Sequence, residues 1–184
     1  LEMMNWQARM ADDLKVCRMI EALGTVLDHS MNRSGRKTVY LSEELRCVDS
    51  YLYIMSMRFG QRMQAEREVD EGLLRMEVPQ LILQPIIENA ILHGVERVKS
   101  GVIRLYIYHD DKNVYLEVIN TCKDISPERI GRIQRMLSGD ESAVLQGSGK
   151  HTSIGMRNVN ERIKLVYGDE YGLFVSVLDN NRFL

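Results

Sequence analysis

The residues from 83 to 94 constrain the fold of this chain most, because an acid and an amide stand inside an otherwise apolar run. On a helix, Pro85, Asn89 and His93 fall on one side at four-residue spacing, and isoleucines and an alanine form the apolar side. Gly94 stands where a C-terminal cap belongs. A polar pair in so apolar a helix costs free energy unless it meets a partner. Two interpretations remain open: a buried Asn that holds a loop through hydrogen bonds, and an Asn that meets a ligand.

The composition is that of a soluble globular protein. Of 184 residues, 27% are charged and 45% are hydrophobic, and the formal net charge is -2. No global basic field points to nucleic acid or to an anionic membrane. No apolar run reaches the roughly 18 residues that span a bilayer. The cysteines at 17, 47 and 122 are too widely spaced for a CxxC metal site and fit no disulfide framework, which indicates a reducing compartment.

The first sixty residues have the period of amphipathic helices. Apolar residues from Leu14 to Leu27 recur at helical steps, and the polar stretch 32–37, which contains Gly, interrupts the pattern. Ser42 ahead of two glutamates predicts the N-cap of a further helix, and Gly60 predicts its end. We expect amphipathic helices packed on each other, whose exposed stripes can also form a dimer seam.

The remainder of the chain alternates between strand and helix patterns. The expected elements begin with a strand over 63–69, a helix that follows Pro79 and runs to His93, and an antiparallel hairpin of 103–108 and 114–119. They continue with a helix opened by Ser126 and Pro127 and ended near Gly139, a long polar loop over 138–153, a helix over 154–167 and a strand over 171–178. Helices first and a layer of strands and helices second predict an α+β fold.

Three stretches resemble one family. Residues 83–94, LQPIIENAILHG, match the N-box of the GHKL ATP-binding fold at every position, in the form LQPxxENAxxHG found in sensor histidine kinases of the LytS/YesM type. Residues 153–168 resemble the second glycine box of that family, GIGLxNVxERLxLxYG. Residues 41–45, 51–52 and 58–60 resemble the connection ahead of its ATP domain. Together the three matches cover most of the chain at the expected spacing.

The resemblance implies a fold and a domain division. The fold is a GHKL-type two-layer α/β sandwich, in which a mixed, mostly antiparallel sheet has helices on one face and follows an N-terminal helical segment. Residues 1–60 are then a remnant of the helical dimerisation and phosphoacceptor domain with its connector. Residues 61–184 are the ATP-binding catalytic domain, lacking its last strand.

The N-box implies a site for ATP and Mg²⁺. The amide oxygen of Asn89 is suited to Mg²⁺, which prefers oxygen ligands and bridges phosphates. Glu88 is the nearest acid for orienting or activating the attacking group. It lies roughly 100° round the helix from Asn89, so a structural role for Glu88 stays open. His93, on the face of Asn89, is expected to contact phosphate or ribose.

The second glycine box implies the phosphate end of the site. Gly155 is expected to begin a helix whose N–H groups bind phosphate. Lys150, in the expected lid over the nucleotide, reaches the triphosphate as a point charge. Ser153 replaces the first Gly of the box, and a solvated surface cation is the alternative for Arg157. The residues implied here are Lys150, Ser153, Ile154, Gly155, Met156 and Arg157.

The first glycine box, DNGxGI, departs from the family pattern. This chain has NTCKDI, so the adenine-reading Asp becomes Asn120, Cys122 and Asp124 replace the two glycines, and Ile125 is kept. The oxygen of Asn120 can still accept a hydrogen bond from the adenine amino group, but without the charge-assisted strength of a carboxylate. Our hypothesis is that nucleotide binding is weak, altered or lost.

The phosphate-accepting His of the family lies in a PHFLxNTL helix. Leu1 matches the end of that motif, so we expect the acceptor upstream and no phosphoacceptor in this chain. His29 has no matching context. A fragment of this kind is not expected to autophosphorylate alone.

The resemblance implies a protein-histidine kinase. The full-length protein would pass the γ-phosphoryl of ATP to a His and then to a response regulator, by positioning and metal electrostatics. It would act as a homodimer and as the cytoplasmic portion of a plasma-membrane sensor, reaching the membrane only through upstream segments, with no nucleic acid as partner. Two alternatives remain: a degenerate nucleotide-binding or regulatory module of the same fold, and another enzyme on this fold, against which the helical lead-in argues.

Overall fold

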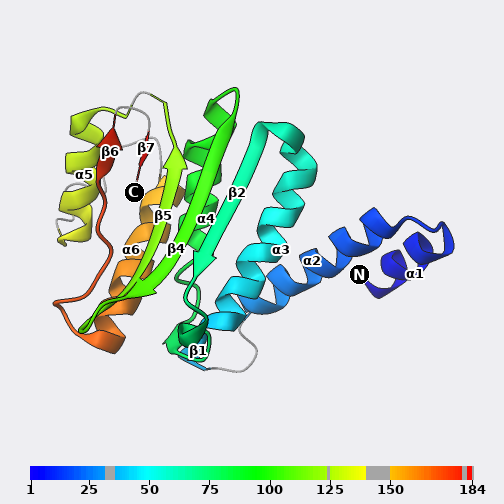
Figure 1. The fold of residues 1–184 in the computed structure, drawn as a ribbon, viewed down its shortest axis with the longest axis horizontal. Coiled ribbons are helices and arrows are strands. Elements are labelled where there is room, and N and C mark those ends of the chain that lie inside the picture. The colour runs from blue at the N-terminus through cyan, green and yellow to red at the C-terminus, as the bar shows by residue number, and fades with distance from the viewer. Residues whose placement is uncertain (32–35, 124, 140–149, 180–181, 184) are drawn as a thin grey trace.

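The N-terminal part of the structure is helical (Figure 1). The structure, a computed structural model, describes residues 1–31, 36–123, 125–139, 150–179 and 182–183. The first helices are α1 (Glu2–Met10), α2 (Leu14–Met31) and α3 (Leu41–Phe59). α2 packs on both α1 and α3, and α1 with the first turns of α2 projects away from the rest of the molecule. The prediction of packed helices in this region is confirmed.

The prediction that Ser42 caps α3 is wrong, and the prediction that α3 ends at Gly60 is confirmed. The helix begins at Leu41, with Tyr40 as N-cap in place of Ser42. The Tyr40 N–H donates to the Glu43 carboxylate at 3.2 Å, so the acid at the third helical position satisfies the N–H of the N-cap residue, as in a capping box. At the other end Gly60 has a φ of 56°, the left-handed region that favours glycine.

A five-stranded mixed sheet forms the second part, in the order β2-β4-β5-β7-β6. Its strands are β2 (Met63–Val69), β4 (Gly101–His109), β5 (Val114–Thr121), β6 (Val177–Asp179) and β7 (Arg182–Phe183). β2 runs parallel to β4 and the other neighbours are antiparallel, which confirms a mixed, mostly antiparallel sheet. A separate ribbon of β1 (Thr38–Tyr40) and β3 (Glu77–Pro79) was not predicted.

The predicted strand over 171–178 is largely wrong. Only Val177–Asp179 joins the sheet. Ahead of it, helix side chains hold the chain: the Leu173 N–H donates to Asn160 Oδ1 at 2.8 Å, and Gln134 Nε2 donates to the Val175 carbonyl at 3.0 Å. Backbone groups paired with side chains in this way are not available to a strand neighbour.

The remaining helices are α4 (Gln84–His93), α5 (Pro127–Leu137) and α6 (Lys150–Tyr167), with short 3₁₀ turns at η1 (Gly60–Arg62), η2 (Glu71–Leu73) and η3 (Val95–Arg97). The hairpin and the Ser126 cap of α5, which accepts from the Arg129 N–H, are confirmed. α6 begins at Lys150, four residues ahead of the expected start at 154.

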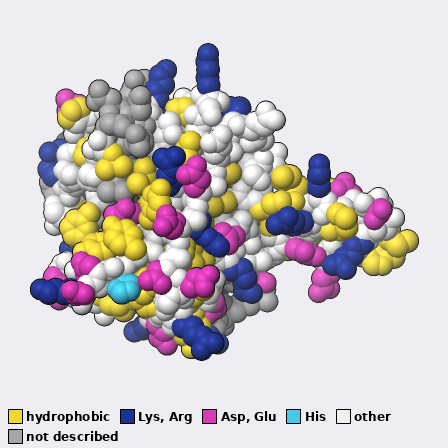
Figure 2. All heavy atoms as spheres, in the orientation of Figure 1, with side chains coloured by type: hydrophobic (Ala, Val, Ile, Leu, Met, Phe, Trp, Pro, Cys, Tyr) yellow, Lys and Arg dark blue, Asp and Glu magenta, His cyan; other side chains and the backbone are white. Residues whose placement is uncertain are grey.

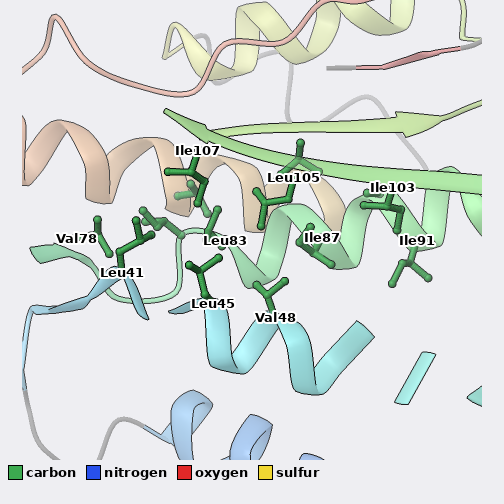
Figure 3. Close-up of a cluster of buried hydrophobic side chains, with 14 of the residues drawn as sticks. Leu41, Leu45, Val48, Val78, Leu83, Ile87, Ile91, Ile103, Leu105 and Ile107 are labelled. Carbon is green, nitrogen blue, oxygen red and sulfur yellow. The ribbon is translucent and has the colours of Figure 1, made fainter. Parts of the chain in front are cut away.

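The main core lies between β4 and α3, with α4 in the middle (Figure 3). Every second residue of β4 faces it, which is the period of a strand buried on one side. Ile87 and Ile91 of α4 and Val48 of α3 complete the layer, all 2% exposed or less. Each such side chain contributes roughly 1.5–3 kcal/mol by burial. This packing fixes the rotation of α4 and therefore the direction in which its polar residues point.

Candidate functional site at helix α4

Asn89 is the polar residue of α4 that most suggests a ligand. Its side chain is half-buried, and Nδ2 is buried with no hydrogen-bond partner among the residues that the structure describes. Leaving such a group unsatisfied costs about 1–3 kcal/mol. Because oxygen and nitrogen of an amide are told apart by their partners, either atom can occupy this position. The alternative of a satisfied Asn that holds a loop gains no support in this part of the chain.

His93 follows Asn89 by one helical turn and is half-buried. Burial lowers the pKa of His93, and the positive charges of Arg129 and Arg97 lower it further. The direction favours the neutral imidazole near neutral pH. A neutral ring contacts phosphate or ribose through a hydrogen bond rather than an ion pair.

Gly94 brings the end of α4 against the end of β5. A Cβ at this position would lie 2.3 Å from Asn120 Nδ2, 2.4 Å from the Ala90 carbonyl oxygen and 2.5 Å from the Thr121 carbonyl oxygen. Only glycine leaves room for this approach. The two segments that the resemblance assigned to the phosphate and adenine ends of a nucleotide site are thus adjacent.

The first glycine box begins in the buried end of β5. Asn120 and Cys122 are 4% and 2% exposed. Asn120 Nδ2 donates to the Thr121 carbonyl at 3.0 Å, so the amide oxygen is the atom that can meet the adenine amino group. Ile125 is half-buried, and Asp124 lies outside the described residues.

The start of α6 differs from the expected phosphate site. Gly155 is the sixth residue of the helix, so its N–H lies within the helix and the expectation that it begins α6 is wrong. The N–H groups without an intrahelical acceptor belong instead to the first four residues. The side chains of Lys150 and Ser153, which stand there, lie outside the described residues. Gly155 lies beside α4, where an added Cβ would be 3.8 Å from Pro85 Cβ.

The other residues of the second glycine box divide between core and surface. Met156 is buried in a small cluster with Met136 of α5. Ile154 is half exposed. Arg157 Nε donates to Glu161 Oε1 at 2.7 Å on the same helix, which favours the surface-cation alternative.

Glu88 faces α3 rather than the adenine end. Its carboxylate accepts from Gln84 Nε2 at 2.9 Å, and Gln84 Oε1 accepts from Cys47 Sγ at 3.1 Å. Burial, with smaller contributions from Glu44 and then Glu88, raises the pKa of Cys47 to about 12. Burial and then Glu88 raise the pKa of Tyr51 to about 12 as well. The side chains of Glu88 and Asn89 therefore lie in different surroundings, with Glu88 facing α3.

Two arginines near His93 were missed by the sequence analysis. Arg97 of η3 and Arg129 of α5 both lower the pKa of His93. Burial, Arg97 and Arg132 in turn lower the pKa of Arg129. Like charges brought together and partly desolvated are stabilised by an anion. Neither Arg97 nor Arg129 belongs to a family motif, so only the fold reveals them.

The amide of Asn89 is a suitable ligand for a magnesium ion that is bound together with phosphates. Within the described residues, no group of three or more His, Cys, Asp or Glu side chains can hold a metal ion. Mg²⁺ in phosphate-transfer sites is bound by one or two protein oxygens, several waters and the phosphates. The single amide of Asn89 is compatible with that coordination.

Comparisons with known proteins identify the family. The family model described as histidine kinase matches residues 1–63. The sensor histidine kinase YesM of Bacillus subtilis is 30% identical over 94% of this chain and 27% of its own length. The sensor protein LytS of Oceanobacillus iheyensis is 24% identical over 91% of this chain and 28% of its own length. The chain belongs to the sensor histidine kinases of the YesM and LytS type. It spans about a quarter of the length of these kinases.

A solved structure supports the fold of this chain. The catalytic domain of histidine kinase ThkA, in a nucleotide-free form, superposes with a TM-score of 0.54 at 16% identity, over 79% of this chain and 90% of that domain. The expected fold class is confirmed by this match together with the mixed sheet. Over the described residues, none of the helices is both long and apolar enough to span a bilayer.

Proposed function

We propose that this chain is the ATP-binding catalytic core of a two-component histidine kinase. It would direct the γ-phosphoryl of ATP to a His upstream of Leu1, from which a response regulator receives it. The observation that carries this proposal is the buried Asn89 Nδ2, which has no hydrogen-bond partner among the described residues and lies on the helix whose end, at Gly94, meets the end of β5. Family membership supports the kinase class, and the pairing of α4 with the Asn120 segment supports the position of the nucleotide.

The residues divide the work of binding. Asn89 would hold Mg²⁺, which supplies charge neutralisation across the phosphates. The oxygen of Asn120 would accept from the adenine amino group. His93 would donate a hydrogen bond to ribose or phosphate. Arg97 and Arg129 would offset the negative charge of the nucleotide. The start of α6 would present its unbonded N–H groups to the terminal phosphates.

Glu88 would act on the other side of α4, toward the helical segment. Its carboxylate is exposed and held by Gln84, so it can orient or deprotonate an attacking group that approaches along α3. A purely structural role remains the alternative, because the same contacts join α4 to α3.

The projecting helices would serve a homodimer in the full-length protein. Large apolar side chains on α1 and α2 are exposed, and Figure 2 shows hydrophobic atoms on this arm. These side chains are Met3, Met4, Trp6, Met10, Leu14, Val16, Leu23, Leu27 and Met31. A second copy would remove them from water. In the cell the chain would be the cytoplasmic portion of a membrane sensor.

A specific observation favours the second candidate, a degenerate module with weak or no ATP binding. Cys122 is 2% exposed where the family pattern has glycine, and Asn120 carries no charge. Both changes lie at the adenine end, where they would reduce affinity without altering the fold.

Calorimetric titration with ATP and Mg²⁺ distinguishes the two candidates. The wild-type chain should bind, and Asn89→Ala should weaken Mg²⁺-dependent binding about tenfold or more, equivalent to ~1.4 kcal/mol. Asn5→Ala, a substitution of the same type on α1, should leave it unchanged. Absence of binding by the wild type would favour the degenerate module, whereas a sub-micromolar dissociation constant would refute weakening by the altered glycine box.

The chain alone should not autophosphorylate. Nε2 of His29 lies 2.6 Å from a Glu44 oxygen, and its side chain is 10% exposed, so the ring is not presented to ATP. Incubation with labelled ATP, followed by analysis of acid-labile and stable label, tests this. Label on His29 would contradict both the assignment of the acceptor upstream and the structural role of the pair.

A further inference from the structure

Glu44 of α3 is a buried carboxylate that no catalytic assignment uses. Its side chain is fully inaccessible to solvent. Oε1 accepts from the Leu81 N–H at 2.7 Å, and Oε2 accepts from the Ile82 and Leu83 N–H groups at 3.0 Å each. His29 Nε2 lies 2.6 Å from Oε1. The lone pairs of both oxygens are thus engaged by groups from outside α3.

The three N–H groups belong to the turn that leads into α4. Leu81 has a φ of 59°, a left-handed conformation uncommon for a residue other than glycine. Consecutive N–H groups in such a turn converge on an anion. Leu83 is the N-cap residue of α4, and Figure 3 shows its side chain near Leu45 of α3. The Glu44 carboxylate therefore serves as the anion at the N-terminal end of α4.

Helices α2 and α6 meet at the same turn. His29 is in the last turn of α2, and its carbonyl accepts from Gln80 Nε2 at 2.8 Å. From α6, Arg162 Nη1 donates to the carbonyls of Gln80 and Leu81 at 3.0 and 3.2 Å. The turn over 80–83 is held from three sides, and α2 contacts it both directly and through Glu44.

We propose that Glu44 is a positioning residue for α4. We further propose that His29, through its contact with Glu44, makes the position of the α4 N-terminus depend on the position of α2. A displacement of α2 removes one hydrogen-bond partner of the carboxylate and one of Gln80. The turn then relaxes, and the first residues of α4 shift or fray. Asn89 lies two turns along the same helix, so its position changes with them. Where this concerns ATP, it rests on the proposed function.

The contacts through which Glu44 and His29 hold the turn over 80–83 form a joint between α2 and α4. Hydrogen exchange on the intact chain tests this joint without any nucleotide. His29→Ala should raise the exchange of the Leu81, Ile82 and Leu83 amides roughly tenfold and leave the β4–β5 hairpin unchanged. His29→Gln, whose amide can still donate to Glu44, should restore most of the protection. Glu21→Ala, on the same helix, breaks only the exposed pair with Arg9 and should change nothing at 81–83.

Two results would overturn the joint. One is unchanged exchange at 81–83 in His29→Ala. The other is a uniform rise across the chain that His29→Gln does not reverse, because that marks a general loss of stability. Both variants keep Glu44, so the turn retains its acceptor and the test avoids the substitution that is most destabilising.

Titration of the same variants with Mg²⁺ and ATP tests the link to Asn89. His29→Ala should weaken binding several-fold, and Glu21→Ala should not. If the wild type does not bind ATP, the proposed function fails and hydrogen exchange alone decides the joint. If the wild type binds and His29→Ala changes exchange but not affinity, the link from the joint to Asn89 is overturned.

Discussion

The two ends of helix α4 differ in whether their buried polar groups have hydrogen-bond partners. At the N-terminal end, one carboxylate accepts three consecutive backbone N–H groups and pairs with His29. In the C-terminal half, Asn89 Nδ2 is buried with no hydrogen-bond partner among the described residues, and positive side chains gather near His93. Native proteins satisfy most buried polar groups, so an unsatisfied one calls for an explanation. We interpret the first end as the anchor of the helix and the second as its ligand-binding part.

Breaking the anchor should have the largest effect. Glu44→Ala leaves three N–H groups and His29 without their acceptor, and we expect a loss of about 3–5 kcal/mol in the free energy of unfolding. Urea unfolding measures it. Glu21→Ala, which removes an exposed acid of α2, should change the value by less than about 0.5 kcal/mol. A loss below about 1 kcal/mol for Glu44→Ala would mean that water replaces the carboxylate and that the turn is not anchored.

Gly94→Ala should have the next largest effect, because it forces the ends of α4 and β5 apart. The new Cβ would meet two carbonyl oxygens and the Asn120 amide at 2.3–2.5 Å. A loss of about 1–3 kcal/mol in unfolding free energy is expected. Gly131→Ala is the matched control: its Cβ would meet only Arg135 Nη1, at 3.9 Å, and the change should stabilise α5 by up to ~1 kcal/mol. Equal effects of the two substitutions would contradict a close approach at Gly94.

Asn89→Ala should leave stability within about 1 kcal/mol of the wild type, because the lost amide is unsatisfied and alanine favours a helix. The same urea experiment measures it beside Glu44→Ala. This is the sharpest form of the comparison, because removal of the Glu44 carboxylate should cost much stability and removal of the Asn89 amide should cost little. A loss above about 2 kcal/mol would place Asn89 with the structural groups.

The pH dependence from His93 should be the smallest effect. Its pKa in the folded state is lowered from the ordinary value of 6.5, so the unfolded state binds more protons as pH falls through that value. Stability therefore decreases from about pH 7 toward acid by this contribution. His93→Gln should flatten the slope of unfolding free energy between about pH 7 and pH 5. His109→Gln, at the exposed end of β4, is the control, and an unchanged slope in His93→Gln would contradict the direction of the shift.

Elements with a strong local signal were predictable from the sequence. The strands of the β4–β5 hairpin are rich in β-branched and aromatic residues and are separated by a polar turn, and Ser126 followed by Pro127 marks the start of α5. The β1–β3 ribbon was not predictable, because each strand has three residues and its partner lies far along the chain. The segment ahead of Val177 was misassigned because long-range bonds to Asn160 and Gln134 replace the sheet neighbour that its apolar residues suggested.

The candidate site was only partly predictable, for a similar reason. The spacing within α4 placed Asn89 and His93 on one side, which the sequence alone supports. The contact of Gly94 with Asn120 depends on how α4 packs against β5, and the gathering of Arg97 and Arg129 depends on α5 as well. Met156 and Gly155 were expected at the phosphates because α6 was expected to begin later than it does.

The carboxylate of Glu44 also constrains the order in which the chain can fold. Its three backbone donors lie 37, 38 and 39 residues further along the sequence. The first turn of α4 cannot acquire its anion before α3 has docked, so its completion belongs to the late, non-local part of folding. Substitution of Glu44 should therefore accelerate unfolding much more than it slows refolding.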